Sequence, residues 1–117
     1  MTQEDKQLLL RDICVRLPYG VKVRLVYDEN TIEVREMGIG SLHDIIFKNV
    51  NGLPYLRPMS SMTEEEEREY WRIYDICSAD MNFIKLFDWL NEHHFDYRGL
   101  IEMGLALEAP EGMYKNE

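Results

Sequence analysis

The sequence predicts an α+β fold: an N-terminal helix, an antiparallel sheet of three or four strands, and C-terminal helices. Three observations lead to this prediction. Apolar residues recur at helical spacing over the first 17 residues, the period changes to two from residue 21, and helical spacing returns after residue 63. The chain has 117 residues, 45% of them hydrophobic, which is enough for one small domain with a core.

The first helix is predicted to begin at Thr2, because acidic residues follow it in the first turn. Its apolar face should consist of Leu9, Leu10, Ile13, Cys14 and Leu17, with Arg11, Asp12 and Arg16 pointing away. Pro18 and Gly20 should end it. Cys14 and Cys77 both lie in apolar-periodic segments far apart in the sequence, so we expect two buried free thiols.

The alternation that begins at residue 21 predicts a hairpin, with "VKVRLVYD" and "TIEVREM" around the turn residues "DEN". A second hairpin is expected around Asn51-Gly52, between "DIIFKNV" and "LPYLRPM". Pro54 should restrict its last strand to a sheet edge or to the strand's own start. The strands could curl into a small barrel with Gly38 and Gly40 at a bulge or corner, although Ser41 could instead cap a short helical turn.

The second half of the chain reads as helical. A capping box, either Ser61 with Glu64 or Thr63 with Glu66, should open a helix over "EEEEREYWRIYDIC". A further helix is expected over "MNFIKLFDWLNEHH", capped by Ser78 or Asp80. Its buried face should consist of Phe83, Ile84, Leu86, Phe87 and Leu90. A short helix over Tyr97–Met103, capped by Asp96, should follow and should stop at Gly104, with a packing contact at Leu105. The predicted division is residues 1–58, residues 59–110 and a loose tail at 111–117.

Charge is distributed unevenly along the chain. The net charge is −9, yet residues 1–59 contain eight basic and eight acidic residues, so the second half carries all of it. Such a protein repels phosphate groups, which disfavours nucleic acid as a partner. No apolar run approaches the length of a membrane span, and the N-terminus lacks the features of a signal peptide, so we expect a cytoplasmic protein without a membrane partner.

The stretch "WLNEHHFDYRG", residues 89–99, is the densest group of chemically active side chains. Adjacent His93 and His94 project about 100° apart on a helix, so they cannot bind one metal together. His94, four residues after Leu90, should lie on the apolar side and His93 should point outward, and the dipole at a helix C-terminus favours a protonated imidazole. No phosphate-binding loop, nucleophile elbow or dinucleotide fingerprint is present. A cysteine–histidine pair is disfavoured because a thiol on an apolar helix face is unreactive. We therefore predict no catalytic residue, no cofactor and no metal.

Two segments carry a resemblance. "YLRPMSSMTEEE" and "DWLNEHHFDYRGLIEMGLALEAPEGMY" resemble a recurrent ending in small proteins of gut anaerobes, many of them carried by phages or other mobile elements. The resemblance covers about residues 54–114, and the first half is similar only in "LPYG" followed by short strands. It implies a cytosolic accessory protein of a mobile element, and it assigns no activity to any residue.

The predicted function is protein–protein contact with a host or phage protein, with no enzymatic activity. The candidate contact residues combine aromatic and arginine side chains, types that are frequent at binding hot spots, with two glutamates and a histidine. They are Glu65, Glu69, Trp71, Arg72, His93, Tyr97 and Arg98. A sharper form is an acidic helical surface that mimics nucleic acid.

Two alternatives stay open, and the oligomeric state is not determined by the sequence. One is a small enzyme built on a cleft that holds a histidine. The other is a nucleic-acid-binding module in the β half, whose residues would be Lys22, Arg24, Arg35, Lys48 and Arg57 with Tyr19, Tyr27 and Tyr55.

Overall fold

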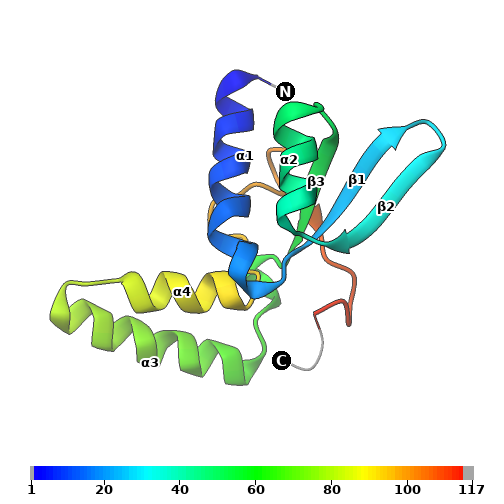
Figure 1. Cartoon of the computed structure of the whole chain (residues 1–117). Coiled ribbons are helices and arrows are strands. Elements are labelled where there is room, and N and C mark those ends of the chain that lie inside the picture. The colour runs from blue at the N-terminus through cyan, green and yellow to red at the C-terminus, as the bar shows by residue number, and fades with distance from the viewer. Residues whose placement is uncertain (1, 115–117) are drawn as a thin grey trace.

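A computed structural model describes residues 2–114, and it confirms the α+β class (Figure 1). The helices are α1 (Gln3–Arg16), α2 (Ile39–Phe47), α3 (Glu64–Asp80) and α4 (Ile84–Glu92). The strands are β1 (Lys22–Asp28), β2 (Thr31–Glu36), β3 (Asn51–Leu56) and β4 (Leu107–Glu108), and short 3₁₀ turns occupy Leu17–Tyr19 and Met59–Ser61. None of the described helices is long and apolar enough to cross a membrane.

The four strands form one open sheet in the order β2-β1-β3-β4. β1 pairs with β2 and with β3 in antiparallel fashion, as predicted, but β4 joins β3 in parallel, so the sheet is mixed and is not a barrel. The parallel pair escaped prediction because β4 has only two residues, too few for a period of two to be recognised.

The second predicted hairpin is wrong. Residues 39–47 form α2, whose N-cap is Gly38, and β3 pairs with β1 instead of with residues 44–50. Gly52 lies inside β3, where a Cβ atom would stand 2.6 Å from Ile45 Cδ1 of α2. The glycine therefore permits close packing of helix on strand and makes no turn. The prediction that Pro54 restricts this strand to a sheet edge or to its own start is wrong, because β3 is an inner strand and Pro54 lies within it, opposite Val23 of β1.

Helix α3 begins as expected and α4 does not. The capping box of Thr63 and Glu66 is present, which settles the frame of α3. Ser78 and Asp80 fall within α3 and cap nothing, and Asn82 Oδ1 accepts from the N–H of Ile84 at the start of α4. The two helices form an antiparallel pair that lies across the end of α1 (Figure 1).

The predicted helix over Tyr97–Met103 is replaced by turns. Asp96 still acts as a cap, because its carboxylate accepts from the N–H groups of Leu100 and Ile101, each at 2.9 Å. Gly99 has a φ of +77°, which interrupts a helical path. The predicted stop at Gly104 is confirmed by a φ of +76° and by a hydrogen bond from Leu105 N to Leu100 O at 2.9 Å.

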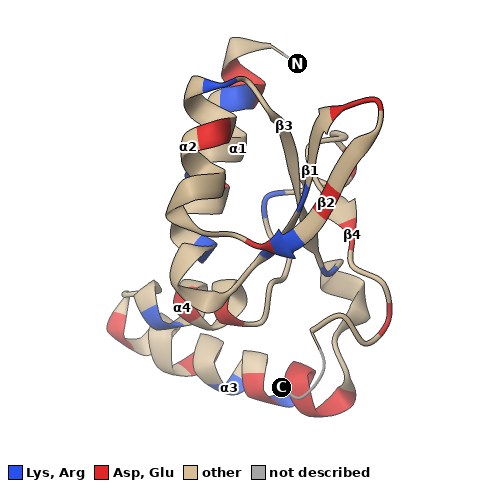
Figure 2. Ribbon diagram, turned by 45° about the vertical axis from the view of Figure 1, so that its right-hand side comes forward, with Lys and Arg blue, Asp and Glu red and all other residues tan. Residues whose placement is uncertain are grey.

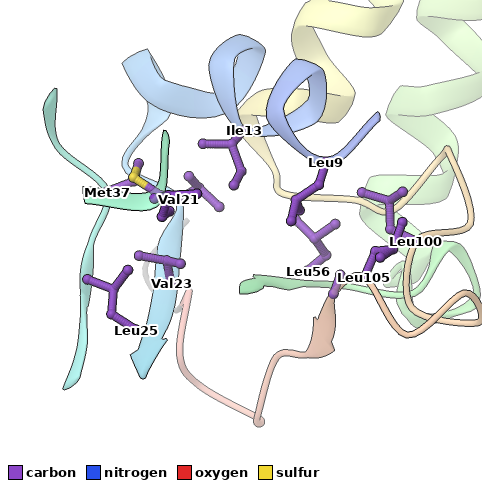
Figure 3. Close-up of a cluster of buried hydrophobic side chains, with 11 residues drawn as sticks. Leu9, Ile13, Val21, Val23, Leu25, Met37, Leu56, Leu100 and Leu105 are labelled. Carbon is purple, nitrogen blue, oxygen red and sulfur yellow. The ribbon is translucent and has the colours of Figure 1, made fainter. Parts of the chain in front are cut away.

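Two hydrophobic clusters hold the molecule together. In the first, Leu9 and Ile13 of α1 face the sheet, and side chains of the C-terminal segment complete the cluster (Figure 3). Its buried members are Leu9, Ile13, Val21, Val23, Leu25, Met37, Ile45, Leu56, Leu100, Leu105 and Ala106. The second lies under α3 and α4, and its buried members are Cys77, Leu86, Trp89, Leu90 and Phe95.

Several predicted burials are wrong. Cys77 is buried but Cys14 is exposed, because α1 is rotated so that Asp12 and Arg16 turn inward. Ile84 and Phe87 of α4 are exposed and Trp89 is buried in their place. Within the predicted loose tail, the hydroxyl of Tyr114 accepts from Lys22 N (2.8 Å) and donates to Tyr55 O (2.7 Å), bridging β1 and β3. Residues 115–117 of that tail lie outside the described residues.

Candidate functional site

An open cleft of about 980 Å³ lies between the start of α3 and the segment that follows β4. Its charged and aromatic lining residues are Arg57, Glu65, Glu66, Glu69, His93, Glu108, Glu111 and Tyr114. Asp and Glu residues gather at the first turn of α3, next to the C-terminal end of the described chain (Figure 2). The cleft thus combines glutamates from two segments that are about 40 residues apart in the sequence.

Arg57, just after β3, forms the base of the cleft. Its guanidinium donates to both carboxylate oxygens of Glu66, at 2.8 and 2.7 Å, and lies 4.2 Å from the centre of the Phe95 ring. Its backbone N–H donates to His94 O, and its carbonyl accepts from Asp96 N, both at 2.8 Å. The hydrogen bond from Arg57 lowers the pKa of Glu66 to about 2, so this carboxylate stays ionised and paired at neutral pH.

Within residues 2–114, the pairing of Arg57 with Glu66 leaves the other glutamates of the cleft without a cation closer than 3.9 Å. Among the ion pairs of the described chain, Glu69 has only a long contact with Arg72, 3.9 Å, and none involves Glu65, Glu108 or Glu111. All these side chains border an open hollow. The cleft therefore presents uncompensated negative charge on both of its sides.

The two adjacent histidines diverge. His93 was predicted to point outward, but its side chain is only 20% exposed: Nδ1 lies 3.7 Å from Glu66 Oε2, and the ring centre lies 4.5 Å from that of Trp89. His94 is buried, as its position on the apolar side predicted, and its ring stacks on Tyr114 at 3.8 Å. The pair is thus divided between two environments, and among residues 2–114 no cluster of three potential metal ligands occurs.

His94 also ends α4. With a φ of +63° it occupies the left-handed position, and Phe95 N closes the motif on Leu90 O at 3.0 Å. Burial, followed by the positive charges of Arg16, His93, Arg57 and Lys22, lowers the pKa of His94 to about 4. The expectation of a protonated imidazole at this helix end is therefore wrong for His94, which is neutral at pH 7.

A buried polar network joins α1 to the segment that follows α4. Asp12 and Arg16, predicted to face away from the core, are fully buried and joined at 2.9 Å. Arg16 also donates to Phe95 O at 2.6 Å, and Arg98 Nε donates to Asp12 Oδ1 at 3.1 Å. Tyr97 packs near both guanidinium groups. Sequence periodicity missed this network because charged residues at helical spacing normally face solvent.

The seven predicted contact residues do not form one surface. Glu65, Glu69 and His93 line the cleft, whereas Trp71 and Arg72 are exposed on α3 outside it. Tyr97 and Arg98 belong to the Asp12 network and serve the fold. The sequence missed Arg57, Glu108 and Glu111 as cleft residues. The acidic balance of the second half was the one pattern pointing to the two glutamates, and it gave no positions.

The acidic run of α3 does not form a single face. Residues advance by about 100° around an α-helix, so Glu67 lies about 200° from Glu65. Neighbouring acids therefore point to opposite sides of α3, which argues against the nucleic-acid mimic.

The basic residues of the β half are likewise separated. Arg24 and Lys22 lie on one face of the sheet and Arg35, which pairs with inward-facing Val23, lies on the other. Arg57 is engaged by Glu66, and Lys48 follows α2. These residues provide no continuous basic surface for nucleic acid.

No protein-family model, curated protein or solved structure matches this chain. Functional inference therefore depends on the geometry of the cleft.

Proposed function

We propose that this protein is a non-enzymatic interaction module that binds a cationic segment of a partner protein in the acidic cleft. One observation supports the proposal above the others. Glu65 and Glu69 of α3 face the same hollow as Glu108 and Glu111, while the arginine among the described lining residues is already neutralised by Glu66. A lysine- or arginine-rich segment would supply the missing positive charge.

The walls of the cleft suit such side chains. Pro58, Ala109 and Pro110 provide apolar surface between the glutamates. Lysine and arginine side chains have aliphatic stems that cover apolar surface while their charged ends stay near carboxylates. An acidic hollow also concentrates cationic ligands and accelerates their association.

Apart from His93, which keeps the enzyme alternative open, the polar groups of the cleft favour binding over catalysis. Glu66, with a pKa of about 2, is held ionised by Arg57 and is a poor proton carrier at neutral pH. Two hydroxyls have structural tasks: Ser61 Oγ donates to Pro58 O at 2.7 Å, and Thr63 Oγ1 accepts from Glu66 N at 3.1 Å. The origin in a phage or other mobile element, the cytoplasmic location and a host or phage partner stay predictions.

The proposal can be tested with a fluorescently labelled oligolysine peptide, followed by anisotropy at low salt. The variant E65Q/E69Q/E108Q/E111Q should bind at least about fourfold more weakly, because each of the four exposed pairs contributes about 0.2–1 kcal/mol. The matched control is E29Q/E64Q/E67Q/E102Q, which removes the same charge from exposed glutamates outside the cleft. Equal weakening by both variants would show that net charge alone attracts the peptide, and the cleft would lose its assigned role.

A further inference from the structure

The outer edge of the sheet is a second surface of interest. β2 stands at the edge, all six of its residues are exposed, and no described strand pairs with its outer side. The β1–β2 hairpin projects away from the helices, so this side is accessible (Figure 1). Natural edges are usually shortened or interrupted by proline or lysine. β4 at the opposite edge has two residues, whereas β2 has six and contains neither proline nor lysine.

The free hydrogen-bonding groups of β2 can be assigned. Just after β2, Met37 N donates to the carbonyl of Val21, the residue before β1, at 2.8 Å. The backbone N–H of Met37 therefore points to the β1 side. In an antiparallel pair, alternate residues bond to the partner strand, so Glu33 and Arg35 also bond to β1. The N–H and C=O groups of Ile32, Val34 and Glu36 therefore face outward.

We propose that β2 binds β2 of a second copy of this chain, in antiparallel fashion about a two-fold axis at Val34. This register forms hydrogen-bonded pairs from all three outward-facing residues. It also places Glu33 opposite Arg35 of the second copy, and Arg35 opposite its Glu33, at the closely spaced non-hydrogen-bonded positions. Moving the axis to Glu33 places two glutamates face to face, and moving it to Arg35 places two arginines face to face. Of these three registers, the one with its axis at Val34 places opposite charges face to face.

The side chains of β2 agree with this arrangement. Ile32 and Val34 are 58% and 51% exposed, on the same side of the sheet as their β1 neighbours Val26 and Arg24. In the dimer the two Val34 side chains meet at the centre, and the two sheets continue into one. Within one copy Arg35 lies 3.2 Å from Glu33, so both side chains are on the same face of the sheet. In the dimer, the Glu33 and Arg35 side chains of the second copy would lie next to them on that face.

Sedimentation equilibrium tests the proposal directly. The wild-type chain should have a weight-average mass about 1.7 times the 14.0 kDa of one copy at about 0.5 mM, where a dimer with a Kd of about 100 µM is about three-quarters assembled. Val34→Pro should be monomeric with an unchanged circular dichroism spectrum, because the N–H that proline removes faces away from β1.

Charge reversal identifies the register. Glu33→Arg and Arg35→Glu should each weaken self-association by at least about tenfold, since each places like charges opposite one another twice. The double variant E33R/R35E should recover the dimer, and an equimolar mixture of the two single variants should form heterodimers. A monomeric wild type overturns the proposal, as does a dimer that is indifferent to Val34→Pro and to both charge reversals.

Discussion

Replacing Asp12 by asparagine removes the anion at the centre of a buried network while keeping the size of the side chain. Asp12 and Arg16 are both 0% exposed, and the carboxylate accepts from Arg16 at 2.9 and 3.2 Å and from Arg98 at 3.1 Å. After the change, the guanidinium of Arg16 has no anion nearby and is closed off from water. Arg98, whose side chain is 29% exposed, can turn towards solvent.

The expected cost follows from this difference in exposure. Removing one partner of a buried ion pair typically destabilises a protein by about 3–5 kcal/mol, because the other charge is left uncompensated. Arg16 carries that penalty, and the hydrogen bond that it keeps to Phe95 O offsets only a part of it. Arg98→Ala should cost about 1 kcal/mol or less, because a partly exposed pair contributes little.

Urea unfolding followed by far-ultraviolet circular dichroism at pH 7 measures these changes as differences in midpoint at constant slope. The informative comparison is the double variant D12L/R16M, in which no buried charge is left between the two positions. It should be more stable than D12N. Relative to the wild-type chain, its main cost should be the loss of the hydrogen bond from Arg16 to Phe95 O, about 1–3 kcal/mol.

A loss of less than about 1 kcal/mol for D12N would refute the reasoning, because a buried and uncompensated guanidinium cannot be that inexpensive. Strict additivity of the single changes D12L and R16M would also contradict it. Residues that share a buried pair should show a coupling free energy.

Three further predictions concern His94, the start of α3 and the packing of α2. Burial lowers the pKa of His94 from 6.5 to about 4, so on acidification the unfolded chain takes up this proton before the folded chain does. The free energy of unfolding should therefore fall between about pH 6.5 and pH 4, by at most about 3 kcal/mol. In urea titrations at several pH values, His94→Asn should lack this decrease, and asparagine tolerates the positive φ of this position. Thr63→Ala should lower thermal stability by about 1 kcal/mol through loss of the capping box, and Ser60→Ala, outside the box, serves as its control. Gly52→Ala should lower the free energy of unfolding in urea by about 1–3 kcal/mol, because the new methyl group would stand 2.6 Å from Ile45 Cδ1. The double variant G52A/I45V, in which this neighbour is shorter, should recover part of the loss. An unchanged urea midpoint for Gly52→Ala would contradict the close packing.

Much of the local structure could be predicted because it depends on neighbours in the sequence. The capping residue Thr63, the β1–β2 hairpin and the left-handed stop at Gly104 each arise within a few residues. The errors arose where a distant element changed the meaning of a local pattern. Asn51-Gly52 has the composition of a turn, but the glycine is required by Ile45 packing across the strand.

The candidate site shows the same division. Glu65, Glu69 and His93 were chosen from residue type and position on predicted helices, and all three line the cleft. Glu108 and Glu111 could not be added, because only the parallel pairing of β4 with β3 brings them beside α3. Tyr97 and Arg98 were selected for the same chemistry and lie instead against the buried Asp12.

The sequence by itself therefore determined the fold class, the starts of α1 and α3, the first hairpin and the acidity of the second half. Those properties depend on periodicity, on capping within one turn and on composition. The tertiary structure alone decided which charges are buried and which glutamates converge. Both depend on contacts between segments far apart in the chain, such as Arg16 with Phe95 and Tyr55 with Leu107, and a one-dimensional pattern does not contain them.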